Sequence, residues 1–297
     1  MKACFISGHT PVEVAKDPWG LTGEWCWVKA YNADVLNPRN VARDWGVLDK
    51  YDLIFIPGYI QTFHFLRELR GRSRPRGKII TWIDYPAELL PRLPAVQQDP
   101  TLPGEIKVAD LIISPVPLHE PYYKGGDSHI VSMVHPVDGE RLQDKVIPAP
   151  NREQPICLWV FHRWAPDVWP RIIPIVRQHP ELWHIAIGLT QEGVEHATMY
   201  VEEAYTWSPR ADYLALVRRA AHVVDMHPYV SMGRVTLEAA SLGVPVQADR
   251  TPTCRVDVDN WYGGIQGGLG PVQAEQVKKH WIREAKKDLD AAIKYLE

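Results

Sequence analysis

Residues 225–249 read DMHPYVSMGRVTLEAASLGVPVQAD, which predicts a strand end, a turn, a short helix and a second strand. Ser231 is a suitable helix cap, Gly243 comes just past the helix end, and Pro245 prevents the helix from continuing. Glu238 shares a helical face with apolar residues, where a carboxylate costs free energy unless it is paired. One such partner is a ligand hydroxyl. The alternative is an ordinary αβ unit in which Glu238 reaches solvent or an arginine.

The start of this helix has the chemistry of an anion site. Gly233 would let a phosphate approach the backbone N–H groups there. The helix dipole favours negative charge at the same end.

The stretch resembles the signature of nucleotide-sugar glycosyltransferases of the GT-B class, which are α/β proteins with two Rossmann-like domains facing across a cleft. It is most similar to the retaining group that includes glycogen synthases and bacterial mannosyltransferases. That group typically reads Glu-Gly-Phe-Gly, then Leu-Glu-Ala-x-Ala-x-Gly-x-Pro-Val. Val230 stands where the group has a further Glu near the sugar, so the retaining outcome is not carried over. The matching residues are Gly233, Leu237, Glu238, Ala239, Gly243, Pro245 and Val246.

The resemblance implies a donor site in the second half of the chain. Glu238 would hold the nucleotide ribose, and the backbone of Ser231, Met232, Gly233 and Arg234 would hold the diphosphate. The donor would be a nucleotide-diphosphate sugar, most simply a UDP-sugar. Because these backbone donors and the helix dipole can stabilise the leaving diphosphate, a metal-independent reaction is expected.

Two further residues are implicated by their positions relative to the family pattern. Arg163 follows the expected strand ICLWVF and would bind the diphosphate, because a guanidinium gives bidentate donors and stays charged. The family's usual Lys is replaced by Trp169, with Arg171 as a substitute. Trp207 stands at the position where proteins of this family contact the nucleobase, and its ring would stack on the base. The alternative for Arg163 is an ordinary surface residue at a strand end. The alternative for Trp207 is an aromatic side chain of the core.

Composition limits the classes of protein that fit. The chain has 297 residues, 45% of them apolar, and a net charge of −3, which argues against a globally polybasic nucleic-acid protein. Four scattered cysteines fit a reduced cytosolic protein. We expect no signal peptide and no membrane span. The expected location is the cytoplasm, or the host cytoplasm for a viral protein.

Alternation of apolar strands with helical segments predicts two doubly wound parallel sheets. A Pro-rich stretch at 148–155 separates them as a linker. We expect an acceptor-side domain at 1–145, a donor domain at 146–275 and a C-terminal segment at 276–297 that crosses back to the first domain. The last helix is expected at Val272–Leu296. The expected strands are Lys2–Ser7, Ala33–Leu36, Asp52–Pro57, Lys78–Ile83, Ala109–Ser114, His129–Val134, Ile156–Phe161, Trp183–Gly188 and His222–Met226.

Asp84 is the candidate catalytic base. It follows the strand KIITWI, and a carboxylate in a cleft can deprotonate an acceptor hydroxyl, as an inverting transferase requires. The alternative is a turn aspartate before Pro86. His9, His64 and His119 are other candidates, although a lone histidine is more often structural.

The segment RELRGRSRPRGK, residues 67–78, is rich in basic side chains. It indicates either a solvated turn or a surface for an anionic acceptor such as DNA, a lipid phosphate or an acidic glycan. The acceptor-binding candidates are Arg72, Arg74, Arg76 and Lys78.

The sequence therefore predicts a hexosyltransferase that moves a sugar from a nucleotide-diphosphate sugar to a hydroxyl. Compact GT-B chains occur among viral enzymes that glycosylate hydroxymethylated bases, so the acceptor expected first is such a base in DNA. A glycan or lipid acceptor is the alternative. A GT-B-like nucleotide-sugar epimerase and a non-catalytic nucleotide-sugar-binding protein are the other classes.

Overall fold

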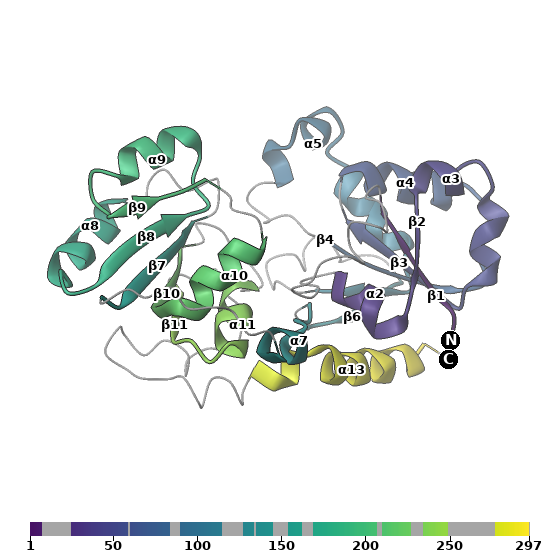
Figure 1. The fold of residues 1–297 in the computed structure, drawn as a ribbon. Coiled ribbons are helices and arrows are strands. Elements are labelled where there is room, and N and C mark those ends of the chain that lie inside the picture. The colour runs from purple at the N-terminus through teal and green to yellow at the C-terminus, as the bar shows by residue number, and fades with distance from the viewer. Residues whose placement is uncertain are drawn as a thin grey trace. The chain divides into compact units, whose positions relative to one another are not determined.

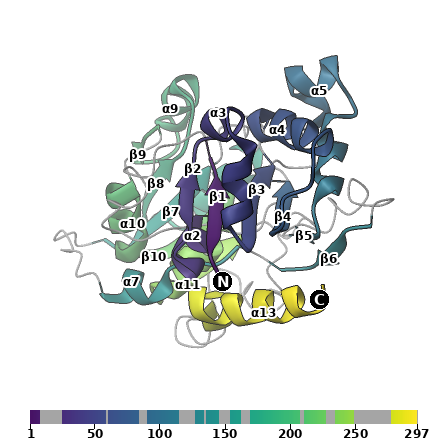
Figure 2. The ribbon, with the colours of Figure 1, turned by 90° about the vertical axis from the view of Figure 1, so that its right-hand side faces the viewer.

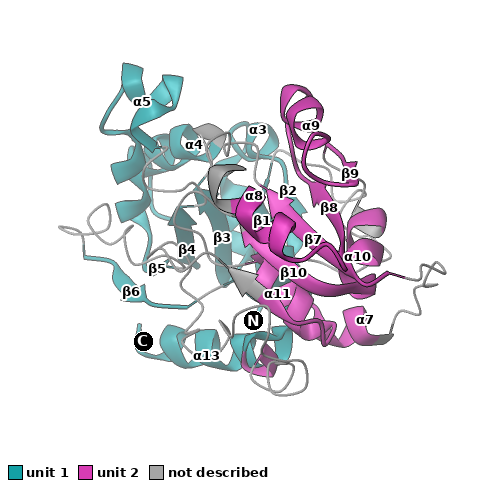
Figure 3. Cartoon of the chain, turned by 90° about the vertical axis from the view of Figure 1, so that its left-hand side faces the viewer, with its two compact units in different colours: residues 1–17, 21–137, 280–297 teal, residues 18–20, 138–279 magenta. Residues whose placement is uncertain are grey.

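The chain, here a computed structural model, forms two compact units (Figure 3). Unit 1 contains the described residues of 1–137 and 280–297, and unit 2 contains those of 138–279. Among the described residues, the chain passes from unit 1 to unit 2 between Val137 and Asp138, before the expected boundary at 145. The structure describes residues 1–7, 25–58, 60–83, 90–114, 127–133, 135–144, 154–161, 169–206, 210–226, 234–248 and 277–296.

Unit 1 has a six-stranded sheet in the order β2-β1-β3-β4-β5-β6, and every described pair is parallel (Figure 1). The central strands are buried on both faces, which explains why they read as apolar runs. The strands are β1 (Ala3–Ile6), β2 (Asp34–Leu36), β3 (Leu53–Gly58), β4 (Lys78–Ile83), β5 (Leu111–Ile113) and β6 (His129–Val131).

Helices and 3-10 turns accompany this sheet along the chain. The α-helices of unit 1 are α2 (Trp25–Tyr31), α3 (Pro38–Val41), α4 (Ile60–Arg70), α5 (Pro94–Gln98) and α13 (Ile282–Lys294). The 3-10 helices are η1 (Trp45–Lys50), η2 (Leu90–Arg92) and η3 (Leu102–Val108), and η6 (Lys278–His280) precedes α13.

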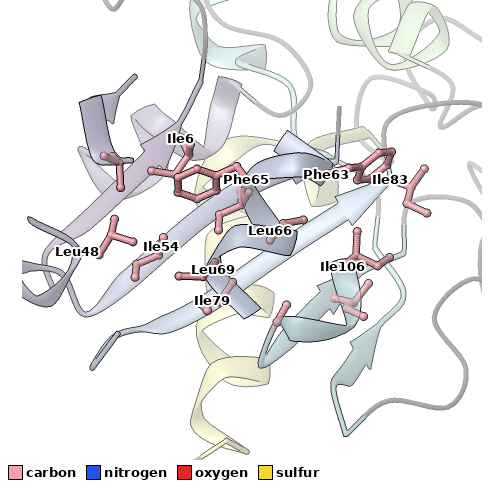
Figure 4. Close-up of a cluster of buried hydrophobic side chains, with 14 of the residues drawn as sticks. Ile6, Leu48, Ile54, Phe63, Phe65, Leu66, Leu69, Ile79, Ile83 and Ile106 are labelled. Carbon is pink, nitrogen blue, oxygen red and sulfur yellow. The ribbon is translucent and has the colours of Figure 1, made fainter. Parts of the chain in front are cut away.

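Successive residues of a strand point to opposite faces, so the sheet of unit 1 builds two separate cores. Ile54 of β3 lies in the core covered by α4, together with Phe63 and Leu66 (Figure 4). The next residue, Phe55, lies in the other core with Leu289 of α13. The second core therefore needs residues from both ends of the chain.

The C-terminal helix α13 is fixed to α2 by polar contacts as well as by burial (Figure 2). The Tyr31 hydroxyl donates to the Asp290 carboxylate (2.8 Å), and Lys286 donates to its second oxygen (2.6 Å). The Lys286 ammonium also lies 4.4 Å from the Tyr31 ring centroid. Burial, and then the hydrogen bond to Asp290, raise the pKa of Tyr31 above its usual range.

The helix expected at Val272–Leu296 is wrong in extent. Trp281 has an extended backbone (φ −72°, ψ 156°) and separates η6 from α13. Val137 pairs with Trp281 in a parallel bridge, and its N–H donates to the His280 carbonyl (3.0 Å). This pairing takes the backbone groups that a continuous helix would need. Residues 272–276 lie outside the described residues.

Unit 2 has a five-stranded sheet in the order β11-β10-β7-β8-β9, again with parallel pairing throughout its described strands. Its strands are β7 (Ile156–Phe161), β8 (Trp183–Ile187), β9 (Glu203–Ala204), β10 (Ala220–Met226) and β11 (Val246–Ala248). Its α-helices are α7 (Gly139–Asp144), α8 (Trp169–Gln178), α9 (Gln191–Ala197), α10 (Arg210–Arg219) and α11 (Arg234–Ser241).

A buried histidine links the central strands of unit 2. The Trp159 indole N–H donates to Nδ1 of His184 (3.1 Å), and Nε2 of His184 lies 2.9 Å from the His179 carbonyl oxygen. Nδ1 must accept and Nε2 must donate, so His184 is neutral with its proton on Nε2. The buried ring nitrogens of Trp159 and His184 are therefore satisfied by one defined tautomer.

The elements that the sequence pattern missed are short and polar. β9 has two residues, and α9 reads QEGVEHA, so neither shows an apolar period. α9 is instead defined at its start, where the Thr190 hydroxyl accepts the Gly193 N–H (3.1 Å). Within the described residues, no helix has the length and apolarity to cross a membrane.

Replacing Leu289 by Ala should destabilise unit 1 by about 2–5 kcal/mol, because the side chain is fully buried in the core closed by α13. Denaturant unfolding followed by far-UV circular dichroism measures the change. Asp288→Ala on the exposed face of the same helix is the control and should change stability by less than about 0.5 kcal/mol. Equal effects of the two substitutions would contradict the packing of α13.

Protonation of His222 should destabilise unit 2 in mild acid. Burial, and then the charge of His179, lower the pKa of His222 below its usual value. The folded unit thus favours the neutral ring, and stability falls as the pH drops below about 6.5. The neighbouring Cys157 thiol stays neutral, because burial raises its pKa to about 12. The melting temperature of His222→Gln should fall less than that of the wild type between pH 7.5 and 5.5, and parallel curves would refute this.

Candidate functional site

The strand order of unit 2 reverses between β7 and β10. The chain runs from β7 outward to β8 and β9, and the later strands β10 and β11 lie on the other side of β7. In open parallel sheets, ligands bind outside the carboxyl ends of the strands at such a reversal. β7 ends at Phe161 and β10 at Met226, so the candidate site lies beyond these two residues.

The predicted donor residues follow these two strands along the chain. Arg163 is two residues past the end of β7, residues 231–233 come between β10 and α11, and Arg234 is the first residue of α11. Strand pairing brings together the ends of β7 and β10, where Met226 pairs in register with Phe161. Of the predicted donor residues, Arg163, Trp207, Ser231, Met232 and Gly233 lie outside the described residues, while Arg234 and Glu238 are described.

α11 begins at the carboxyl edge of the sheet. It connects the end of β10 to the start of β11, and these strands are parallel, so it must run back across the sheet. Its first residue, Arg234, is exposed. The first four N–H groups of any helix have no partner within it, and they carry the positive end of the dipole.

The end of α11 is fixed by Gly243, as the sequence predicts. Gly243 has φ +71°, a conformation that favours glycine. Its N–H donates to the Ala240 carbonyl (3.0 Å), and the N–H of Val244 donates to the Ala239 carbonyl (2.9 Å). This is a Schellman motif, which closes the last turn and sets where α11 ends before β11.

Glu238 is 1% exposed and lies in a helix whose residues 235–241 are all buried. Burial of α11 over residues 235–241 is therefore not limited to the face that Glu238 shares with the apolar residues. A buried carboxylate must be paired or hydrogen-bonded. Its role in holding ribose stays a prediction, and a ligand can reach it only where the surroundings of α11 open.

Sequence reasoning missed a second buried acid, Asp225, which is 1% exposed near the carboxyl end of β10. It pairs in register with Val160 of β7 and Ala248 of β11, so it lies beside the strand-order reversal. An aspartate that ends an apolar strand (HVVDM) is the signal that could have identified it.

The end of β8 also belongs to this edge. A Cβ atom at Gly188 would lie 2.0 Å from the Phe161 carbonyl oxygen, and its φ is +81°, so only glycine fits there. Tyr205, just past β9, is 43% exposed, and its hydroxyl donates to Glu203. Trp183 donates to the same carboxylate (2.9 Å). Tyr205 is thus a positioned, accessible aromatic ring two residues before Trp207, which the resemblance assigns to the nucleobase.

In unit 1 the strand order reverses between β1 and β3. Asp84, the candidate base, is the residue after β4 and lies outside the described residues, as do His9 and His119. His64 is described and exposed on α4. The catalytic role of Asp84 stays a prediction.

The basic segment at 67–78 leads into the amino end of β4, so it lies at the edge of the sheet opposite to the strand ends that hold ligands. Several of its cations already have partners. Arg74 pairs with Asp110 (2.7 Å), Arg72 lies 4.8 Å from the ring centroid of Trp45, and Lys78 donates to the Leu296 carbonyl (3.2 Å).

The first two arginines of the segment, Arg67 and Arg70, form ion pairs with Glu105 of η3. The Arg67 guanidinium lies 3.0 Å from Glu105 and 2.5 Å from Asp99, and Arg70 lies 3.5 Å from Glu105. The hydrogen bond from Arg67 lowers the pKa of Asp99 to about 2. Arg76 is exposed, and its backbone N–H donates to Asp49 (3.3 Å). The acceptor role of this segment stays a prediction, and these contacts favour a structural one.

No group of three or more histidine, cysteine or acidic side chains with metal-binding geometry is found among the described residues. The donor residues in the undescribed segments are not covered by this finding. Metal independence therefore stays a prediction.

No protein-family model matches this sequence, and no curated protein matches it either. Solved structures do share its fold. A trehalose-6-phosphate synthase is similar over 99% of both chains, with a TM-score of 0.66 and 10% identity. A sucrose-phosphate synthase from Thermosynechococcus elongatus is similar over 99% of this chain and 89% of its own, with a TM-score of 0.55 and 16% identity.

A UDP-GlcNAc 2-epimerase from Neisseria meningitidis, solved with UDP-GlcNAc bound, is similar over 99% of both chains. Its TM-score is 0.52 and its identity 11%. At these identities the likeness shows the fold alone. The chain has the GT-B fold, with two Rossmann-like domains, and both transferases and epimerases use it.

Proposed function

We propose that this chain, which has the GT-B fold, binds a nucleotide-diphosphate sugar in unit 2 and transfers the sugar to a hydroxyl acceptor. The observation that carries the proposal is the reversal of strand order between β7 and β10, with α11 starting beyond it. Glu238 on that helix stands at the family's position for a ribose-binding carboxylate. A nucleotide diphosphate suits a helix start better than a neutral ligand does.

The donor proposed is a UDP-sugar. The solved epimerase with the same fold holds UDP-GlcNAc, which supports this choice. Arg163 and the backbone of residues 231–234 would bind the diphosphate, and Trp207 would stack on the base. These donors and the helix dipole would stabilise the leaving diphosphate, so the reaction would proceed without a metal.

The acceptor proposed first is a hydroxymethylated base in DNA, with Asp84 removing the proton from its hydroxyl. A base in a duplex would have to be flipped out of the stack. Arg72, Arg74, Arg76 and Lys78 would contact the phosphate backbone rather than the reacting base, since they lie at the amino edge of the sheet. A glycan or a lipid is the alternative acceptor.

Epimerisation of the donor is the second candidate function, supported by the likeness to the solved epimerase. Such an enzyme would convert the nucleotide sugar with no acceptor present. The replacement of the motif Glu by Val230 also keeps a non-catalytic nucleotide-sugar-binding role as a third candidate. Both alternatives keep the donor site and differ from transfer only in the fate of the bound sugar.

One of UDP, GDP and ADP, or its sugar conjugate, should raise the melting temperature of the full chain. Ligand at 100 times its dissociation constant adds about 2.7 kcal/mol of stability. Glu238→Gln should weaken binding about tenfold, because a carboxylate bonds ribose hydroxyls more strongly than an amide does. Glu195→Gln on the exposed part of α9 is the control and should bind like the wild type. Absence of any shift in the wild type would refute the donor site.

Asp84→Asn should abolish transfer while leaving donor binding intact, if Asp84 is the base. Turnover is measured as release of the nucleotide diphosphate with and without hydroxymethylated DNA, and the sugar products are analysed. Asp288→Asn on the exposed face of α13 is the control. If an epimerised sugar forms when no acceptor is present, the enzyme is an epimerase and not a transferase. Full turnover by Asp84→Asn would remove Asp84 from the mechanism.

A further inference from the structure

Among the described residues, Thr236 in the first turn of α11 has a buried hydroxyl that makes no hydrogen bond. The residue is 1% exposed, and within the part of the chain that the structure describes its Oγ1 contacts no donor or acceptor. A buried hydroxyl without a partner costs free energy, so it is normally satisfied by protein, water or a ligand.

The usual local partner is missing for a geometric reason. A threonine inside a helix can bond the carbonyl four residues earlier, and for Thr236 that residue is Met232, which precedes the helix. Thr236 is the third residue of α11, so no helical carbonyl lies in that position.

The side chain of Thr236 leans toward the start of α11, because every Cα–Cβ bond in a helix tilts toward its N-terminus. The side chain therefore lies over the turn whose N–H groups have no partner within the helix. This turn lies at the carboxyl edge of the sheet, beside the strand-order reversal. Arg234, two residues earlier, is exposed, so solvent reaches the same turn.

We propose that Thr236 is a donor-binding residue whose hydroxyl donates a hydrogen bond to a phosphate oxygen of the nucleotide diphosphate bound at the start of α11. The inference rests on the donor site proposed above. It adds a side-chain donor to a set that otherwise consists of backbone N–H groups and an arginine. A hydroxyl bonded to an anionic oxygen forms a charge-assisted bond, which is stronger than a bond to water.

Replacement of Thr236 by Val tests this, since the two side chains have nearly the same shape and differ in the hydroxyl. The full chain is titrated by calorimetry with whichever of UDP, GDP and ADP the wild type binds most tightly. Thr236→Val should weaken that binding about tenfold, the loss expected for one hydrogen bond to a charged group. Thr236→Ser keeps the hydroxyl and should stay within about threefold of the wild type.

The melting temperature without ligand separates binding from a structural role. If the hydroxyl is unpaired, Thr236→Val should have the melting temperature of the wild type or a higher one. If the hydroxyl is bonded to an internal water, the melting temperature of Thr236→Val should fall. Wild-type binding together with equal affinity in Thr236→Val would overturn this inference and leave the proposed function standing. Failure of the wild type to bind any of the three nucleotides would overturn both.

Discussion

The parallel direction of the strands in unit 2 is the constraint on which its candidate site depends. Because β10 and β11 are parallel, the helix between them must return across the sheet, which puts the start of α11 at the carboxyl edge. The reversal of strand order places the carboxyl ends of β7 and β10 side by side. The Schellman motif at Gly243 then fixes the register of the helix against β11.

Buried parallel strands were the most predictable part of the fold. β3, β4 and β7 are continuous apolar runs, and the sequence identified them to within a residue because both of their faces are covered. The two-residue strand β9 carries no periodic signal. The start of α13 was missed because Trp281 pairs with Val137, and no local pattern encodes a partner so distant in sequence.

The candidate site was predictable only through its motif. Gly243 and Glu238 were found from spacing that resembles a known signature, and the helix end is confirmed. The sequence could not reveal that α11 is buried on every side, because Arg234 and the alternation of small residues suggest a half-exposed helix. Asp225 and Thr236 were missed for a related reason, since burial makes these ordinary polar residues notable and burial is a tertiary property.

The core of unit 1 that contains Phe5 and Phe55 is completed by Leu289 and Ile293. These residues are separated by nearly the whole chain, and all of unit 2 is encoded between them. During synthesis from the N-terminus, every residue of unit 2 is therefore made before those of α13. Domains generally fold as units during synthesis. The second core of unit 1 can close only when α13 is present, so the unit that begins the chain is also the one that is completed last.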